Sequence, residues 1–467
     1  MLRIFKVFVP ASVIILLVCE AALLYGSYIA GVFLAQRFMD GPGFARFFMF
    51  EDHGFLRLAI VTATIMFGLY LNDLYERFHA RSAVDLIQPI CMVVGIAFLT
   101  QALMSYAVGG WIVPRYSMIF GSAIVLLLFP LWRVAYSTSV SKAIAAERVL
   151  LLGSSETLAE VAKFLGERPT LGLNVFGFLD DGAGGDDPLP GIPRLGTVED
   201  LANFRDHKPD RVVVGLAERR SQLPVEELLE WRFSGVVIEH AAQLYERTFG
   251  RVCTRDLRPA DLIFSGELGP RHLSVAFQNL YCTLFAGVLL VAFSPVMLLV
   301  AIAVRLSSRG PVLFRQERVG KGDRVFTVYK FRSMAADAEA ETGAVWARPD
   351  DPRITPFGRF LRRSRLDELP QLFNVLKGEM AIAGPRPERP EFVGKLSGEI
   401  PHYRQRHCVK PGITGWAQIN YKYGDSVEDV AMKLEYDLYY IKNMSISLDA
   451  YIFFHTLKTM VLSRGAQ

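Results

Sequence analysis

The sequence predicts a membrane protein with three parts: an α-helical four-span bundle, a Rossmann-like α/β middle domain, and a mostly α-helical C-terminal domain with a re-entrant membrane hairpin. The chain has 467 residues, 51% of them hydrophobic, and a mean hydropathy of +0.27. It is therefore more apolar than an average soluble protein. Long apolar runs lie before residue 140 and between residues 280 and 306, with short strand and helix patterns between them. We expect domain limits at 1–140, 147–265 and 272–467.

Four apolar runs in the first part each approach the ~20 residues that a helix needs to span a bilayer. They cover residues 8–34, 55–71, 86–108 and 112–132. Under the positive-inside rule, the flanking basic residues place three connecting segments in the cytoplasm: Arg3, Lys6, Arg77, Arg81, Arg133, Lys142 and Arg148. The first run has no signal-peptide cleavage pattern, so we expect it to remain in the mature chain. We expect Glu20, which lies inside it, to face the bundle and form a structural hydrogen bond.

The middle part begins with a Rossmann-like order of elements. The pattern predicts a strand at 148–155, a helix at 156–165, a second strand ending at Asp180 and Asp181, and a third strand near 211. The dinucleotide fingerprint is broken, because Ser154 and Ser155 follow Gly153 and Leu158 stands where the third glycine belongs. We interpret this CoA-binding-like domain as a regulatory or dimerising module, so a homodimer is expected and any nucleotide ligand is left open.

The apolar segment at 280–306 determines the topology of the C-terminal part. Four preceding spans return the chain to the cytoplasm, so a fifth complete crossing would carry the following residues outside the cell. Ser294 and Pro295 lie in the middle of this segment, and an interior proline costs an ordinary helix ~3 kcal/mol. We therefore expect a re-entrant break at this dipeptide. A kinked helix that still spans the bilayer is the alternative.

Two adjacent acids, Asp367 and Glu368, form the chemical centre of the chain. They lie between an arginine cluster and the Gly-Pro-Arg-Pro sequence at 384–387, and the cluster comprises Arg359, Arg362, Arg363 and Arg365. The positive electrostatic field of this cluster favours polyanions. Acids inside that field are suited to bind a metal ion or to act as a nucleophile. The Asp-Glu-Leu-Pro sequence is also a common helix start in which the aspartate caps. We retain both interpretations.

A basic strip follows the apolar segment at 305–332, as expected for contact with anionic headgroups. Lys330 and Arg332 lie in a strand pattern that leads toward the acid pair. The strip adjoins a membrane segment and no nucleic-acid-binding motif is found, so we expect no nucleic acid partner. The five cysteines form no CxxC pair, which argues against a disulfide framework or a zinc site.

Several separated motifs carry a family resemblance over residues 272–467. They are KFRSM from Lys330, the DPRIT to NVLKG stretch from Asp351, GPRP from Gly384, and KPGITGWAQIN from Lys410. In this order they resemble the bacterial sugar transferases, that is, the monotopic polyprenyl-phosphate phosphoglycosyl transferases. The whole layout is similar to the long members that start exopolysaccharide or O-antigen assembly.

The resemblance implies transfer of a sugar 1-phosphate from a UDP-sugar to undecaprenyl phosphate, on the cytoplasmic face of the bacterial inner membrane. It implies that Asp367 is the nucleophile and that Asp367 and Glu368 hold Mg²⁺. It also implies that the break at Ser294 and Pro295 turns the helix back to the face from which it entered. The expected substrate-binding residues are Lys330, Arg332, Arg353, Arg365, Arg386 and Lys410. The identity of the sugar is left open.

Two other functions are alternatives to this sugar phosphate transfer. A nucleotide-sugar dehydratase or epimerase would use the Rossmann-like domain, but the glycine fingerprint and a Tyr-x-x-x-Lys pair are missing from the sequence. A non-catalytic polysaccharide assembly component would explain the membrane bundle and leave the acid and arginine cluster unexplained. For Trp416 two roles stay open: stacking on uracil and anchoring at the membrane interface.

Overall fold

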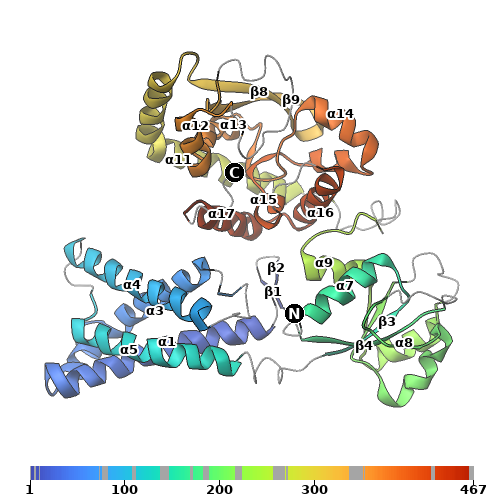
Figure 1. The fold of residues 1–467 in the computed structure, drawn as a ribbon, viewed down its shortest axis with the longest axis horizontal. Coiled ribbons are helices and arrows are strands. Elements are labelled where there is room, and N and C mark those ends of the chain that lie inside the picture. Colours follow the sequence, from blue (N-terminus) through green and yellow to red (C-terminus); the bar gives the residue numbers. More distant parts are fainter. Residues whose placement is uncertain are drawn as a thin grey trace. The chain divides into compact units, whose positions relative to one another are not determined.

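The computed structural model forms two compact units, one built mainly from Val9–Glu239 and the other mainly from His240–Gln467. Figure 1 shows the elements of both units. The structure describes residues 2–4, 7–9, 11–72, 74–75, 83–107, 112–136, 147–168, 172–181, 189–215, 223–255, 269, 272–335, 351, 353–421 and 426–461. Of the basic residues used for topology, Lys6, Arg77, Arg81 and Lys142 lie outside these ranges. The predicted domain limits stay a prediction.

The first unit contains the four predicted membrane helices, each long and apolar enough to cross a bilayer. They are α1 (Ala11–Ala35), α3 (Gly54–Leu71), α4 (Ala83–Ala107) and α5 (Arg115–Ala135). A small hairpin of β1 (Leu2–Ile4) and β2 (Val7–Val9) precedes them, and the short helices η1 (Gln36–Asp40), α2 (Phe44–Arg46) and η2 (Phe47–Glu51) join α1 to α3. Helices α1 and α5 pack closely because glycines lie at their contact. A Cβ on Gly31 would lie only 2.5 Å from the Gly121 nitrogen, too close for any other residue at this separation.

Glu20 faces the interior of this bundle, as predicted. It is fully buried, and Arg133 Nη2 donates to its Oε2 at 3.1 Å. Arg133 also donates to the Leu74 carbonyl at 2.9 Å. The arginine is in the last turn of α5 and is largely buried, and its use as a cytoplasmic flank stays a prediction. Its charge is compensated within the bundle by Glu20.

The middle domain has a parallel sheet with strand order β5-β4-β3-β6-β7, and the pairs β3·β4, β3·β6 and β4·β5 are parallel. The strands are β3 (Glu147–Leu152), β4 (Leu173–Leu179), β5 (Arg194–Gly196), β6 (Arg211–Val214) and β7 (Val237–His240), and the helices are α7 (Glu156–Glu167), η5 (Val198–His207) and α8 (Val225–Phe233). The three predicted strands and the predicted helix are confirmed. Strand β5 lies at the end of a Gly/Pro-rich stretch, residues 180–196, of which residues 182–188 lie outside the described residues.

Serine side chains occupy the turn where a dinucleotide fingerprint would have glycines. The Leu158 backbone N–H donates to Ser155 Oγ at 3.3 Å, which caps α7. Ser154 Oγ donates to Asp180 Oδ2 at 2.8 Å, which ties this turn to the end of β4. The hydroxyls thus use local polar groups that a Rossmann fingerprint leaves for a pyrophosphate.

The second unit is mostly helical, as predicted, and contains two small sheets. Strands β8 and β9 pair antiparallel, and β10 and β11 pair parallel. Its elements in chain order are α9 (Ala241–Phe249), α11 (His272–Ser307), β8 (Leu313–Val319), η7 (Lys321–Asp323), β9 (Val325–Phe331), α12 (Pro356–Ser364), η8 (Leu366–Glu368), α13 (Gln371–Leu376), β10 (Ala381–Ala383), α14 (Pro390–Glu399), η9 (Tyr403–Cys408), β11 (Gly412–Thr414), α15 (Trp416–Asn420), α16 (Val427–Asn443) and α17 (Ile446–Val461).

Helix α11 is the fifth helix apolar and long enough to cross a membrane in the described part of the chain. It continues through Pro295 without an assigned interruption, and Figure 1 shows its ribbon changing direction along its length. Before the proline, Cys282 and Ala286 pack in a cluster with residues of β9, α13 and β10. After it, Val300 and Val304 pack with Phe331 and Leu361. Both halves therefore contact the same unit.

We predict that breaking the Glu20–Arg133 pair from one side destabilises the bundle more than replacing both residues. Glu20→Leu should leave a buried, uncompensated guanidinium, at a cost of about 3–5 kcal/mol. The double variant Glu20→Leu/Arg133→Leu should recover most of that loss. Thermal unfolding of the native chain, the single variant and the double variant, each full-length and solubilised in detergent, ranks their stabilities. A double variant less stable than the single one would contradict the assignment.

Candidate active site

The acid pair lies in the short turn η8, between α12 and α13. Arg365 ends α12 in the left-handed conformation with a φ of 54°, which redirects the chain just before the acids. Asp367 and Glu368 are only 7% and 9% exposed. Helix α13 begins after Pro370 without a side-chain cap, so the predicted capping role of Asp367 was wrong. The pair belongs to a separate 3₁₀ turn.

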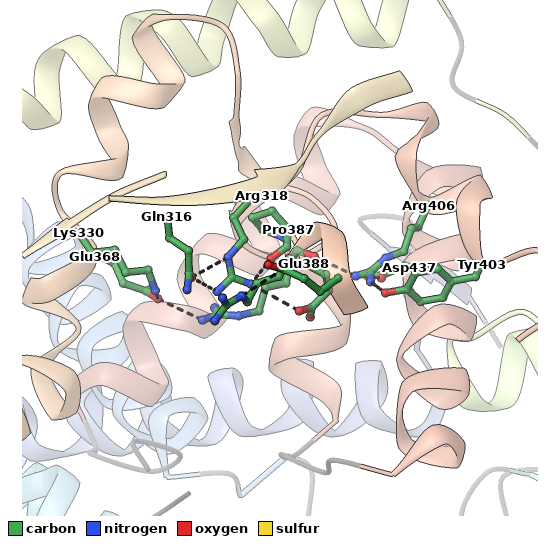
Figure 2. Close-up of polar contacts among 12 residues, drawn as sticks. Gln316, Arg318, Lys330, Glu368, Pro387, Glu388, Tyr403, Arg406 and Asp437 are labelled. Atoms are coloured by element: carbon green, nitrogen blue, oxygen red, sulfur yellow. Dashed lines mark hydrogen bonds and ion pairs between the residues drawn. The ribbon is translucent and has the colours of Figure 1, made fainter. Parts of the chain in front are cut away.

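Three cations surround Glu368. Lys330 Nζ donates to its Oε1 at 2.9 Å, Arg386 Nη2 lies 3.5 Å from the same oxygen, and Arg365 Nη1 lies 3.7 Å from Oε2. Figure 2 shows the contact of Lys330 from β9 with Glu368. Burial favours the neutral acid, but these positive charges outweigh it and hold the pKa of Glu368 well below its usual range. Glu368 is therefore a fixed negative charge at neutral pH.

Asp367 has a contrasting environment. Its carboxylate makes no hydrogen bond to another residue that the structure describes. Burial and the neighbouring Glu368 charge raise the pKa of Asp367 to about 6, although Lys330, Arg362 and Arg386 act in the opposite direction. Acids whose pKa values are pushed apart by their surroundings take different chemical roles. Asp367 is the candidate nucleophile, and Glu368 is the group that organises the cations.

The Gly-Pro-Arg-Pro turn that carries Arg386 is fixed by bonds to its main chain. Arg406 Nη2 donates to the Arg386 carbonyl at 3.0 Å, and Arg318 Nη1 donates to the Pro387 carbonyl at 3.0 Å. The Gly412 N–H donates to the Pro385 carbonyl at 2.9 Å. In Figure 2 the side chains of Arg318 and Arg406 approach Pro387 from different elements. This support limits the positions open to the Arg386 side chain.

Arg406 is itself held by buried partners. It is 6% exposed, its Nη2 lies 2.8 Å from Asp437 Oδ2, and its Nη1 donates to Tyr403 Oη at 2.7 Å. A small pocket adjoins the turn, and its lining includes Arg386, Arg406 and His407. Sequence reasoning did not assign Arg406, and it placed Arg318 in the lipid-facing basic strip. The sequence shows that arginines cluster, but only the tertiary structure shows which of them donate to main-chain carbonyls.

Asn374 is a further residue that the sequence did not identify. It is completely buried in α13; its Nδ2 donates to the Thr327 carbonyl at 2.7 Å, and its Oδ1 accepts from the Tyr329 N–H at 3.2 Å. Both partners belong to β9, the strand that carries Lys330. A side-chain amide thus aligns that strand with the helix following the acid pair.

The remaining predicted binding residues occupy different positions. Arg332 is 6% exposed, and its Nη2 donates to the carbonyl and hydroxyl oxygens of Ser308 at 2.7 and 2.8 Å, beyond the end of α11. Arg353 Nε donates to Asp351 Oδ1 at 2.8 Å. Lys410 is half-buried in the segment before β11. The structure therefore groups Lys330, Arg365 and Arg386 around Glu368, while phosphate-binding roles for the other three stay predictions.

Trp416 fits neither role considered from the sequence. It is 4% exposed, stacks on Tyr439 with ring centroids 5.6 Å apart, and donates from Nε1 to the Gly250 carbonyl at 2.7 Å. A buried, hydrogen-bonded indole is positioned neither to stack on a base nor to anchor at an interface. Its role is internal packing.

Comparisons with known proteins identify the family of this chain. A family model described as bacterial sugar transferase matches residues 274–463, and one described as a CoA-binding domain matches residues 70–222. The chain is 32% identical over 323 residues to the UDP-glucose:undecaprenyl-phosphate glucose-1-phosphate transferase of Klebsiella pneumoniae, an alignment that covers 68% of this chain and 69% of that protein. The chain belongs to the bacterial sugar transferase family.

Two other relatives have higher identity to this chain. The UDP-N-acetylgalactosamine-undecaprenyl-phosphate N-acetylgalactosaminephosphotransferase of Aeromonas hydrophila is 44% identical over 232 residues, which cover 50% of this chain and 54% of the relative. The undecaprenyl-phosphate glucose phosphotransferase of Komagataeibacter xylinus is 37% identical over 342 residues, which cover 69% of this chain and 60% of the relative. The matched region thus spans less than two thirds of either relative's length.

Proposed function

We propose that this protein transfers a sugar 1-phosphate from a UDP-sugar to undecaprenyl phosphate, releasing UMP and forming a polyprenyl diphosphate sugar. The observation that carries the proposal is the acid pair, in which a buried carboxylate without a hydrogen bond partner among the described residues lies beside one that organises three cations. The activities for which the relatives are named support the same reaction class. The product would begin the assembly of an exopolysaccharide or an O-antigen.

In the first step a carboxylate oxygen of Asp367 attacks the β-phosphorus of the UDP-sugar. A bond forms between that oxygen and phosphorus, the bond from phosphorus to the bridging oxygen breaks, and UMP leaves with the electron pair. A sugar-phosphoryl aspartate remains. Lys330 and Arg386 would compensate charge on the phosphate oxygens, which is the main demand of phosphoryl transfer.

In the second step a phosphate oxygen of undecaprenyl phosphate attacks the same phosphorus. The bond between Asp367 and phosphorus breaks, the carboxylate is restored, and the diphosphate product leaves. One phosphate linkage replaces another at each step, so the site mainly has to orient two anionic reactants. Glu368 would keep the cations in place between the two half-reactions.

The oxygen donors of the site fit Mg²⁺ in part. Glu368 is already paired with cations, whereas the Asp367 carboxylate has no partner among the residues described here, and Mg²⁺ commonly takes one or two carboxylates together with substrate phosphates and water. Asp367 would therefore hold the ion, with Glu368 at its side. When bound, Mg²⁺ would neutralise diphosphate charge. No group of three or more acidic, histidine or cysteine side chains occurs within the described residues.

The exposure of α11 supports a re-entrant arrangement. Residues 291–295 are all exposed around the Ser294–Pro295 dipeptide, and consecutive helical residues point about 100° apart. Every face of the helix is therefore exposed to some extent there within the described chain, whereas the flanking stretches pack on the unit. We infer that this tip enters the lipid and returns. The acid pair would then lie at the cytoplasmic surface of the inner membrane.

A topology measurement tests this arrangement. Cysteines introduced by Lys163→Cys in the middle domain and Lys395→Cys in α14 replace exposed lysines. With an impermeant maleimide, both variants should react no more than the unmodified chain in intact cells, and should react fully after lysis. Labelling of Lys395→Cys from outside the cell would show that α11 spans the bilayer.

A single-turnover experiment tests the nucleophile. Full-length protein incubated with UDP-sugar labelled in the β-phosphate, without lipid acceptor, should release about one equivalent of UMP and retain the label on the protein. Asp367→Asn should abolish both signals, because the amide is not a competent nucleophile. Glu391→Gln, which changes an exposed carboxylate, is the matched control. Native turnover by Asp367→Asn would place the nucleophile elsewhere.

The pH dependence of kcat/KM should report the Asp367 carboxyl. Attack requires the ionised form, so activity should fall as the pH drops below the pKa of about 6. Lys330→Met removes a charge that lowers the pKa of Asp367, so the acid limb should move to higher pH. Glu368→Gln removes a charge that raises that pKa, so the limb should move to lower pH. Equal profiles in both variants would contradict the assignment.

A further inference from the structure

We infer that residues 241–254, which follow strand β7 in the sequence, act as a positioning element of the active site by supporting the turn that carries Arg386. The inference rests on the proposed function, because Arg386 is assigned there to the reacting phosphates. The segment comprises α9 and the loop after it, and both belong to the same compact unit as the acid pair. Its contacts converge on helix α16 and on Trp416.

Several polar contacts from the 241–254 segment end on the side chain of Glu435 in α16. Its side chain is 4% exposed and accepts from Tyr245 Oη at 2.8 Å and from the Thr254 hydroxyl at 3.0 Å. Arg251 Nε lies 3.6 Å from the same carboxylate. A buried carboxylate is tolerated only when such partners compensate its desolvation. The segment and α16 are therefore mutually dependent.

Trp416 makes the second connection. Its Nε1 donates to the Gly250 carbonyl at 2.7 Å, and a Cβ on Gly250, whose φ is 64°, would lie 3.2 Å from the indole ring. Trp416 directly follows Gly415, where a Cβ would lie 2.3 Å from the Gly384 carbonyl oxygen. The indole, the two glycine backbones and the start of the Gly-Pro-Arg-Pro turn are thus in close contact.

Two other residues of helix α16 help to hold the turn that carries Arg386. Asp437, two positions after Glu435, pairs with Arg406, which donates to the Arg386 carbonyl. Tyr440 Oη donates to the Ala383 carbonyl at 2.9 Å, just before the turn. One side of α16 therefore binds the 241–254 segment while another fixes the main chain around Arg386.

Arg386 depends on such support because its guanidinium has to be placed beside the acid pair. It lies 3.5 Å from Glu368, and the position of its main chain sets where the guanidinium can reach. Displacements of about 1 Å at a positioning group can cost about 100-fold in rate. Tyr245, Trp416 and Glu435 are positioning residues in this sense, since none of them contacts the acid pair.

Non-additivity with Arg386 tests the inference in the full-length protein. Trp416→Phe keeps an aromatic ring and removes the hydrogen bond to Gly250, and we expect it to lower kcat about five- to tenfold, roughly what one lost hydrogen bond gives. In an Arg386→Ala background the same change should alter the residual kcat less than about twofold, because positions that act through a shared partner are not additive. Rates are divided by the single-turnover UMP burst, which counts folded sites.

Two variants serve as checks. Tyr245→Phe removes the hydrogen bond from the 241–254 segment to Glu435, and its effect on kcat should likewise be smaller in the Arg386→Ala background. This variant keeps the test available if Trp416→Phe folds poorly. Tyr421→Phe, which removes a 2.6 Å bond to Asp429 on the same helix, should leave kcat unchanged. Equal losses in both Arg386 backgrounds, or no loss in either, would overturn the inference. Absence of UMP release by the native protein would instead refute the proposed function.

Discussion

The ion pair between Lys330 and Glu368 is the interaction on which the organisation of this site depends. Without a nearby cation, two adjacent buried carboxylates would repel each other, and at least one would take up a proton near neutral pH. The ammonium of Lys330, supported by two arginines, keeps Glu368 ionised. Asp367 is then left as the acid whose protonation responds to the pH range of the cell. A division of roles between identical functional groups thus results from their surroundings.

The rest of the C-terminal unit holds the members of this pair in place from several directions. Asn374 fixes the strand that carries Lys330, and Arg318 and Arg406 fix the turn that carries Arg386. These residues satisfy backbone carbonyls and N–H groups that would otherwise be buried without partners. Some of the arginines in the sequence therefore serve to hold the main chain. Preorganisation of this kind reduces the reorganisation required during reaction.

The sequence predicted the membrane helices and the middle sheet because both follow from periodic patterns. Apolar length identified the four spans, and alternating strands and helices identified the parallel sheet. The acid pair was identifiable because two carboxylates stood beside an arginine cluster. The roles of Arg406, Asn374 and Trp416 could not be predicted, because their partners lie between 20 and 166 positions away in the sequence. The pairing of Arg133 with Glu20 could not be predicted for a similar reason, since the two residues lie on different helices.

The strand β9 joins two regions that differ greatly in their surroundings. Lys330 neutralises Glu368, and two residues later Arg332 is bonded to Ser308 at the end of an apolar helix. A change in the thickness of the surrounding hydrocarbon layer would displace an apolar segment inserted in it. Such a displacement would move an anchor only two residues from the ammonium group that pairs with Glu368. The length of the lipid acyl chains would then act on this ion pair through two residues of backbone.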